Sequence, residues 1–183
     1  MGGERQTERL LLRRPNSDDR ALYHAHFTHP AIERWLRPPP LPAFSAGALD
    51  ELVEGDCAHW SDHGFGPWVL IERKSGAFAG RGGLHWTVVE EKAMVELAWS
   101  IEPQLHGSGY ATEMAEAACE WASEMQIEEL VALVLPANTS SRRVAEKVGC
   151  EPAGEVEHAG LPHLLFRLRV DSTSPLQTGQ PAS

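Results

Sequence analysis

One segment of the sequence restricts the fold more than any other, because a strand pattern, a glycine turn and a helix pattern follow one another there. In residues 93–101, Val95 and Trp99 share one face of the predicted strand and Glu96 lies on the opposite face. In residues 109–125 the apolar positions recur at helical spacing. A strand that leads directly into an amphipathic helix predicts an α/β sheet covered by that helix. The glutamates that we expect on its solvated face are Glu113, Glu116, Glu120 and Glu124.

The rest of the chain extends this segment into a mixed sheet with helices on both sides. Residues 129–135 form a continuous apolar run, which is typical of a strand covered on both faces. Gly80, Gly82 and Gly83 interrupt one strand pattern and indicate a bulge. The seven predicted strands span residues 8–14, 67–73, 77–88, 93–101, 129–135, 150–157 and 162–170. The predicted helices start at the N-cap Ser17, span 45–62 and 109–125, and run from the N-cap Asn138 through residue 148.

A length of 183 residues fits a single domain, which we expect to span residues 1–170. Residues 171–183 hold few large apolar side chains and predict a flexible C-terminal tail. The prolines of residues 38–42 exclude a helix there. No apolar run approaches the roughly 20 residues of a membrane helix, and no secretory signal precedes the first strand.

The charge balance narrows the classes of partner. With 16 Lys and Arg against 26 Asp and Glu, the formal charge is −10, which disfavours direct nucleic-acid binding and favours a cationic ligand by steering. Cys57, Cys119 and Cys150 are odd in number and far apart, as expected of reduced thiols in the cytoplasm. We therefore predict a cytoplasmic protein that binds neither membranes nor nucleic acid.

The glycine turn before the predicted helix of residues 109–125 suits an anion. Gly107 and Gly109 let the backbone bend and expose its amides, which join the free N–H groups of the helix start. A diphosphate fits such a cradle best, although a tight structural connection would also use these glycines. The chain has no Walker motif, and Thr112 stands where a dinucleotide-binding fingerprint needs its third glycine.

Residues 104–111 (QLHGSGYA) resemble the Q/R-x-x-G-x-G/A signature of the GNAT superfamily of acyl-CoA-dependent N-acetyltransferases. Residues 138–149 (NTSSRRVAEKVG) and the opening residues 7–13 (TERLLLR) look like its RimJ/RimL-type branch. The resemblance spans about residues 7–170. It implies the GNAT fold, a mixed and mostly antiparallel seven-stranded sheet flanked by helices, in which the two central parallel strands splay apart.

The same resemblance implies a site for acetyl-CoA and no metal. The pantetheine arm would pair with the strand at Trp99, Ser100 and Ile101, the pyrophosphate would lie on the amides around residues 106–111, and Asn138 would face the pantetheine or acetyl end. Asn138 is also an ordinary helix N-cap. The residues implied in cofactor binding are Trp99, Ser100, Ile101, Gln104, Leu105, His106, Gly107, Ser108, Gly109, Tyr110, Ala111, Thr112 and Asn138.

Two residues are the candidates for catalysis. Glu96 is an acid within a central strand beside the proposed thioester gap, so it is the candidate general base, acting through water. It could instead orient the ammonium of the acceptor or pair with an arginine. Many similar enzymes protonate the departing thiolate with a tyrosine, but Ala145 matches that place here. Ser141 offers a hydroxyl in its stead, unless it is a plain first-turn serine.

The predicted function is transfer of acetyl from acetyl-CoA to a primary amine. An α-amine has a pKa of about 7.7–8.0 against about 10.4 for lysine, so its deprotonation at pH 7 costs about 1 rather than about 4.6 kcal/mol. One glutamate without a strong acid therefore suits an α-amine or a weakly basic small amine, and this favours a protein N-terminal α-amine. The alternatives are a small amine, such as an antibiotic or polyamine, and a regulatory acyl-CoA-binding module without turnover.

The acceptor side of the site is less well marked in the sequence. Because this region is a variable acceptor-side loop in similar proteins, the resemblance makes Trp35 and the proline loop of residues 38–42 the candidates for shaping the acceptor cleft. His24, His26 and His29 could line that cleft, but we expect them to be exposed, and we expect Trp86 and Trp121 to be in the core. His59 and His63 have the spacing of one face of a zinc site but lack a third ligand. A homodimer would match similar proteins, and the sequence leaves the oligomeric state open.

Overall fold

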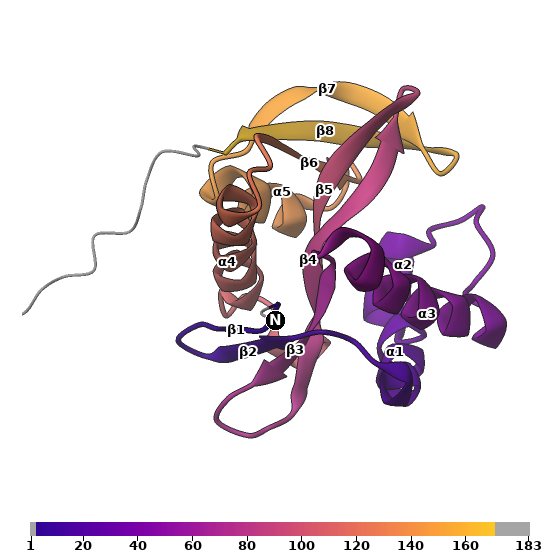
Figure 1. Cartoon of the computed structure of the whole chain (residues 1–183). Coiled ribbons are helices and arrows are strands. Elements are labelled where there is room, and N and C mark those ends of the chain that lie inside the picture. The colour runs from indigo at the N-terminus through magenta and orange to yellow at the C-terminus, as the bar shows by residue number, and fades with distance from the viewer. Residues whose placement is uncertain (1–2, 171–183) are drawn as a thin grey trace, which may run out of the picture.

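The computed structural model describes residues 3–170 and contains one eight-stranded sheet. Its strand order is β1-β2-β3-β4-β5-β6-β8-β7, and β5 and β6 are the parallel pair at its centre (Figure 1). The α/β class and the mixed, mostly antiparallel sheet are confirmed. The strands are β1 (Arg5–Gln6), β2 (Leu10–Arg13), β3 (Pro67–Glu72), β4 (Phe78–Val89), β5 (Lys92–Ile101), β6 (Glu129–Val134), β7 (Glu151–His158) and β8 (Leu161–Arg169).

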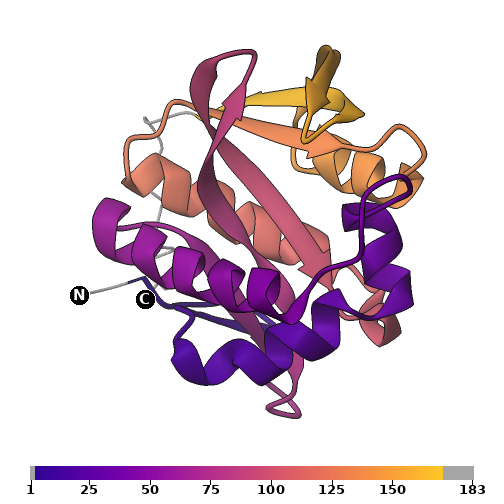
Figure 2. The same ribbon diagram turned by 90° about the vertical axis from the view of Figure 1, so that its right-hand side faces the viewer.

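Helices cover both faces of the sheet, as Figures 1 and 2 show. Three of them, α1 to α3, lie on one face, where Tyr23, Val53 and Val69 belong to one buried cluster. On the other face α4 packs on the centre of the sheet, and Met114 meets Leu97 and Leu130 in the largest cluster. The helices are α1 (Arg20–Phe27), α2 (Pro30–Leu36), α3 (Ala46–His63), α4 (Tyr110–Glu124) and α5 (Thr139–Lys147), with short 3-10 turns at Ser17–Asp19 and Pro103–Leu105.

The structure differs from the predicted fold in three features. The sheet has eight strands rather than seven, because the short segment Arg5–Gln6 pairs with β2. Helix α2 was not predicted, since its seven residues are too few to show a clear period. The first N-cap is Asn16 rather than Ser17, and Asn16 forms a reciprocal capping box with Asp19.

The predicted bulge in the glycine-rich strand is confirmed. The register between β3 and β4 shifts between Leu70 and Ile71, opposite Gly80 and Phe78. Gly80 has a φ of +144°, and a Cβ there would lie 2.2 Å from the carbonyl oxygen of Ser100 on β5. Glycine at this position thus allows β4 to approach β5 where the site begins.

Among the described residues, no helix is both long and apolar enough to cross a membrane. The predicted tail, residues 171–183, lies outside the described part of the chain.

A buried ion pair fixes α3 to the sheet. Asp56 accepts two hydrogen bonds of 2.6 Å from the guanidinium of Arg81 on β4, and Tyr23 on α1 donates its hydroxyl to the same carboxylate at 2.7 Å. Asp56 is 5% exposed. Tyr23, Asp56 and Arg81 therefore connect α1, α3 and β4, and loss of any one of them leaves a buried polar group without its partner.

We predict that Asp56→Ala lowers the free energy of unfolding by about 3–5 kcal/mol, because Arg81 would remain in place without its counter-ion. The control is Glu54→Ala on the same helix, which removes an exposed pair with Arg20 and costs under about 1 kcal/mol. Urea unfolding followed by tryptophan fluorescence measures both. Equal losses in the two variants would contradict the role of the pair.

Candidate active site

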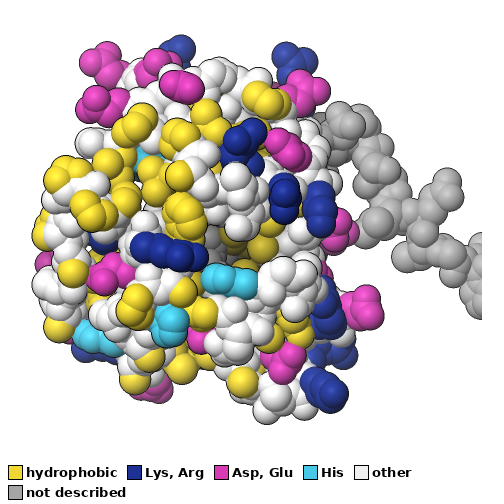
Figure 3. All heavy atoms as spheres, turned by 180° about the vertical axis from the view of Figure 1, so that it is seen from behind, with side chains coloured by type: hydrophobic (Ala, Val, Ile, Leu, Met, Phe, Trp, Pro, Cys, Tyr) yellow, Lys and Arg dark blue, Asp and Glu magenta, His cyan; other side chains and the backbone are white. Residues whose placement is uncertain are grey.

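A cavity of about 650 Å³ opens where β5 and β6 separate. The two strands are in register only at Val95↔Leu130 and Glu96↔Val131. Beyond these positions the cavity lies between β5, β6, the loop that leads into α4, and the start of α5. Figure 3 shows this side of the molecule hollowed, with Lys, Arg and His side chains at the edge of the hollow. The predicted splaying of the central strands is confirmed.

β5 and β6 diverge from each other, but each remains hydrogen-bonded to its outer neighbour, β4 or β8. β5 stays paired with β4 as far as Ile101↔Gly80, and β6 stays paired with β8 as far as Val134↔Leu164. Trp99 lies on β5 beyond the last shared register and packs against both the α4 cluster and the cluster under α5. Among the described residues no β5–β6 partners follow Glu96↔Val131, so the main-chain groups that face the gap remain available to a ligand.

The loop before α4 forms the predicted amide cradle. Gly107 and Gly109 have φ values of +75° and +86°, which favour glycine. The amides of His106 and Ser108 donate weakly within the loop, at 3.2 and 3.3 Å. Five further amides have no hydrogen-bond acceptor among the described residues, and they belong to Gly107, Gly109, Tyr110, Ala111 and Thr112. This cluster of free donors at a helix N-terminus suits a pyrophosphate.

An arginine directly before β2 braces this loop, and the sequence analysis did not predict it, because its partners are about 100 residues away. Arg9 donates from Nη1 to the carbonyl of Ser108 at 2.7 Å and from Nε to Glu113 at 2.6 Å, and it lies over the Tyr110 ring. Glu113 was predicted to be solvated, but its side chain is only 13% exposed. Burial opposes its ionisation, yet hydrogen bonds from Thr7 and Arg9 outweigh that and lower its pKa.

Glu96 lines the cavity and stands on β5 at the last position where β5 and β6 are paired. Its side chain is 12% exposed, and its Oε2 lies 3.3 Å from Nε2 of His85 on β4. The other ring nitrogen of His85 is buried and has no hydrogen-bond partner among the described residues. His85 itself is not among the lining residues, so it stands behind Glu96 and can hold that carboxylate in place.

His26 is buried rather than exposed as predicted. Its Nδ1 donates to Glu102 at 2.5 Å, and its Nε2 lies 2.7 Å from the hydroxyl of Ser100, so a neutral ring satisfies both partners. Burial lowers the pKa of His26 more than Glu102 raises it. The contact ties α1 to the end of β5.

His106 Nε2 lies 2.7 Å from the carbonyl oxygen of Ile101, so this acceptor of β5 is already used within the protein.

Most of the predicted cofactor residues meet at the cavity. Gln104 and Ser108 do not line it, and the side-chain Nε2 of Gln104 donates to the carboxylate of Glu102 at 3.2 Å instead. The lining residues from that prediction are Trp99, Ser100, Ile101, Leu105, His106, Gly107, Gly109, Tyr110, Ala111, Thr112 and Asn138.

The start of α5 forms the opposite wall. Asn138 caps the helix by accepting from the amide of Ser141 at 3.1 Å, as predicted, and both residues line the cavity. Ala145 is fully buried in the cluster beneath the helix, so it does not reach the cavity. Arg143 and Lys147 also line it, although the sequence prediction did not include them.

Helix α2 and the loop after it form the third wall, where Trp35 lines the cavity. His24 pairs with Asp50, and His29 caps α2 through the amide of Ala31, so neither belongs to the lining. Trp86 was predicted to be in the core but is 44% exposed. Both ring nitrogens of His59 are used, by the carbonyl of Phe65 and the amide of Trp86.

The chain is similar to known proteins in sequence and in fold. The Acetyltransferase (GNAT) domain model matches residues 9–151. The protein YkkB of Bacillus subtilis (strain 168) is 27% identical over 150 residues, 78% of this chain and 82% of YkkB. An acetyltransferase from Agrobacterium tumefaciens superposes with a TM-score of 0.78 at 25% identity, over 92% of this chain and 95% of that one.

Two further structures share the fold at lower identity. The ribosomal-protein-S5-alanine acetyltransferase of Vibrio fischeri has a TM-score of 0.71 at 16% identity, over 95% of this chain and all of that one. The aminoglycoside acetyltransferase AAC(6')-Ib has a TM-score of 0.71 in its complex with ribostamycin and coenzyme A, at 16% identity over 88% and 94% of the chains.

The family model covers most of the chain, so the chain belongs to the GNAT acetyltransferase family. It is an acyl-CoA-dependent N-acetyltransferase, and enzymes of this family use acetyl-CoA as the acyl donor.

The buried His26 makes stability depend on pH. Its pKa is below 6.5 in the folded protein, so below pH 6.5 the unfolded chain takes up the proton first. Its contribution to stability is therefore complete above pH 6.5 and is lost as pH falls. We predict that NMR titration places the midpoint of His26 below 6.5. Below pH 6.5 the free energy of unfolding falls as the pH falls. We expect His26→Gln to reduce the slope of this fall by up to about 1.4 kcal/mol per pH unit. A midpoint at or above 6.5 would contradict this.

Proposed function

We propose that the chain transfers acetyl from acetyl-CoA by direct attack of a primary amine, and that an N-terminal α-amine is the favoured acceptor class. The observation that carries the proposal is the opening of the sheet beside Glu96, which leads into the amide cradle at residues 107–112. The RimJ/RimL-type motifs and the likeness to the ribosomal-protein-S5-alanine acetyltransferase support the acceptor class. The equal likeness to AAC(6')-Ib supports a small amine as the alternative.

The cavity offers acetyl-CoA a polar end and an apolar stem. The free amides of Gly107 and of residues 109–112 bind the pyrophosphate, and Arg143 and Lys147 add positive charge for the phosphates. The pantetheine arm lies between the parted strands and pairs with the free main-chain groups of Trp99 and Ser100. The carbonyl of Ile101 is already bonded to His106, so this residue contributes less than the sequence predicted.

The reaction forms one C–N bond and breaks one C–S bond, with the amine losing a proton and the sulfur of CoA gaining one. Glu96 accepts the proton of the amine through a water, and His85 holds the carboxylate in place from β4. Ser141 donates a hydrogen bond to the sulfur as the thiolate leaves, which stabilises the developing charge. The α5 wall provides no tyrosine for this role, since Ala145 is buried beneath it.

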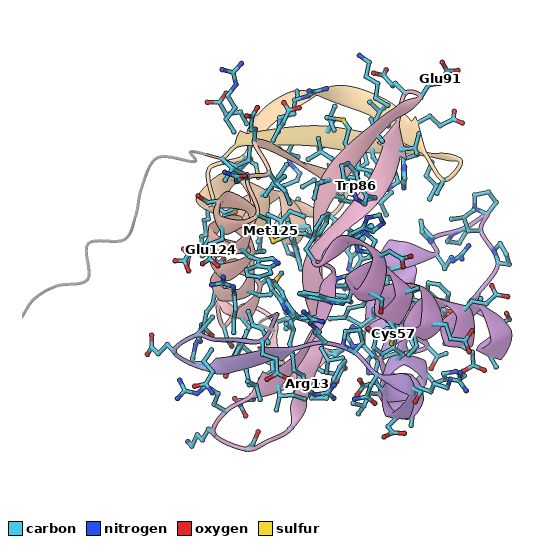
Figure 4. The ribbon with its side chains drawn as sticks, in the orientation of Figure 1. Arg13, Cys57, Trp86, Glu91, Glu124 and Met125 are labelled. Carbon is cyan, nitrogen blue, oxygen red and sulfur yellow. The ribbon has the colours of Figure 1, made fainter. Side chains whose placement is uncertain are left out.

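We predict that Glu96→Gln lowers kcat by a factor on the order of 10² at pH 7, because the amine loses its proton acceptor. The deficit should narrow as pH rises toward the pKa of the amine, and KM for acetyl-CoA should change little. The control is Glu91→Gln at the tip of the same β4–β5 hairpin (Figure 4). Thiol release over a pH series measures both variants, and unchanged turnover in Glu96→Gln would remove its role as base.

The brace at the cradle gives a second prediction. Arg9→Ala should raise the Kd for coenzyme A about tenfold, or about 1.4 kcal/mol, because the loop loses its contacts with Ser108 and Glu113. Arg5→Ala is the matched control, since Arg5 pairs with Glu124 at the other end of α4 (Figure 4). Isothermal titration calorimetry gives both affinities. Wild-type affinity in a folded Arg9→Ala variant would contradict the proposed cradle.

One observation favours a binding module without turnover as the second candidate. Tyr110 is the cavity-lining tyrosine, and its hydroxyl donates to Glu72 at 2.5 Å, so it is not free to protonate a thiolate. Thiol release from acetyl-CoA over a panel of amines separates the two functions. Coenzyme A binding without release from any amine would favour the module. The cytoplasmic location stays a prediction.

A further inference from the structure

The charge of the acceptor wall differs from that of the whole protein. The chain carries a formal charge of −10, yet Glu96 is the sole acidic residue among the described residues that line the cavity. Arg143 and Lys147 come from α5, whose wall the proposed function assigns to the cofactor, whereas Arg34 comes from α2, next to Trp35, the residue predicted to shape the acceptor cleft. Glu96 and Arg34 are therefore the carboxylate and the guanidinium that an acceptor would meet, and the lining adds the imidazoles of His106, His158 and His163.

Arg34 is available to bind a ligand. Within the described residues it forms neither an ion pair nor a hydrogen bond, and its guanidinium carbon lies 5.0 Å from the centre of the Trp35 ring. Glu33, the acid next to it in the sequence, accepts from the amide of Phe44 at 3.1 Å and does not neutralise it. An arginine held over an aromatic ring, with free donors at a cavity, suits the two oxygens of a carboxylate.

The remaining side chains of this wall are apolar. Ile32, Trp35, Leu36 and Leu41 line the cavity around Arg34, and Leu36 is 39% exposed. Such a wall suits a ligand with an apolar body and a small number of charged groups. A polycation would meet a single carboxylate and would place further positive charge beside Arg34, which is unfavourable.

We propose that the acceptor is a primary amine that also carries a carboxylate, with the amine at Glu96 and the carboxylate at Arg34. The proposal rests on the proposed acetyltransferase function and specifies its substrate class. A free amino acid and a peptide with an acidic N-terminal residue both present this chemistry. Steering by the net charge alone would have favoured a polycation, but the charges that line the cavity oppose one.

Matched acceptor pairs test the proposal on the wild-type enzyme. Phenylalanine is compared with phenethylamine, and the amidated peptide Asp-Phe-Ala with Asn-Phe-Ala, with spermidine as the polycation. We expect kcat/KM to be about tenfold higher for the carboxylate member of at least one pair, and the pair that responds identifies the source of the carboxylate. Spermidine should be the poorest acceptor.

Variants of α2 show whether Arg34 produces this preference. Arg34→Gln should bring the ratio within a pair to about one, and Arg34→Glu should reverse it. Arg37→Gln is the control, because Arg37 lies one turn later over Phe44 and does not line the cavity. Calorimetric binding of the carboxylate acceptor to the coenzyme A complex should weaken about tenfold in Arg34→Gln and stay unchanged in Arg37→Gln.

Equal rates within both pairs, faster acetylation of spermidine, or a preference that survives in Arg34→Gln would overturn the inference while leaving the acetyltransferase function in place. Coenzyme A binding with no thiol release from any of these amines would overturn the proposed function and the inference together.

Discussion

β5 and β6 pair at only two positions and then separate, and the features of the site depend on that separation. A parallel pair in the centre of a sheet would normally remain bonded along its length, because unpaired buried main-chain groups are unfavourable. Here β4 and β8 hold the two strands from outside, and Trp99 fills the space between the clusters under α4 and α5. The opening is thus part of the folded structure, and a ligand with its own hydrogen-bonding groups can complete it.

The loop before α4 is held beside the gap between β5 and β6 by contacts from residues that are distant in the sequence. Arg9, at the edge of β2, contacts the loop, the first turn of α4 and the Tyr110 ring. His26 on α1 bonds the end of β5 from the other face. These contacts fix the amides of the cradle relative to Glu96, so the donor and acceptor ends of the reaction are positioned by the same sheet.

The sequence predicts what is local and misses what depends on distant partners. The strand, glycine turn and helix of residues 93–125 were predicted because periodicity and glycine placement act within a few residues. The pairing of Arg9 with Glu113 spans 104 residues, so a helix wheel could only show Glu113 as a polar position. His26 and Trp86 were predicted wrongly for the same reason, because burial is decided by elements far away in the sequence. The short strand Arg5–Gln6 exists only through its pairing with β2.

The central claim is that free main-chain groups of β5, of Gly107 and of residues 109–112 hold coenzyme A. Backbone amide NMR of the protein, titrated with coenzyme A, tests it most directly. The account predicts large shifts at Gly107, Gly109 and Tyr110 and along β5 from Leu97 to Ser100, with small changes at the β4–β5 hairpin tip. Saturable binding that leaves these amides unshifted would contradict it.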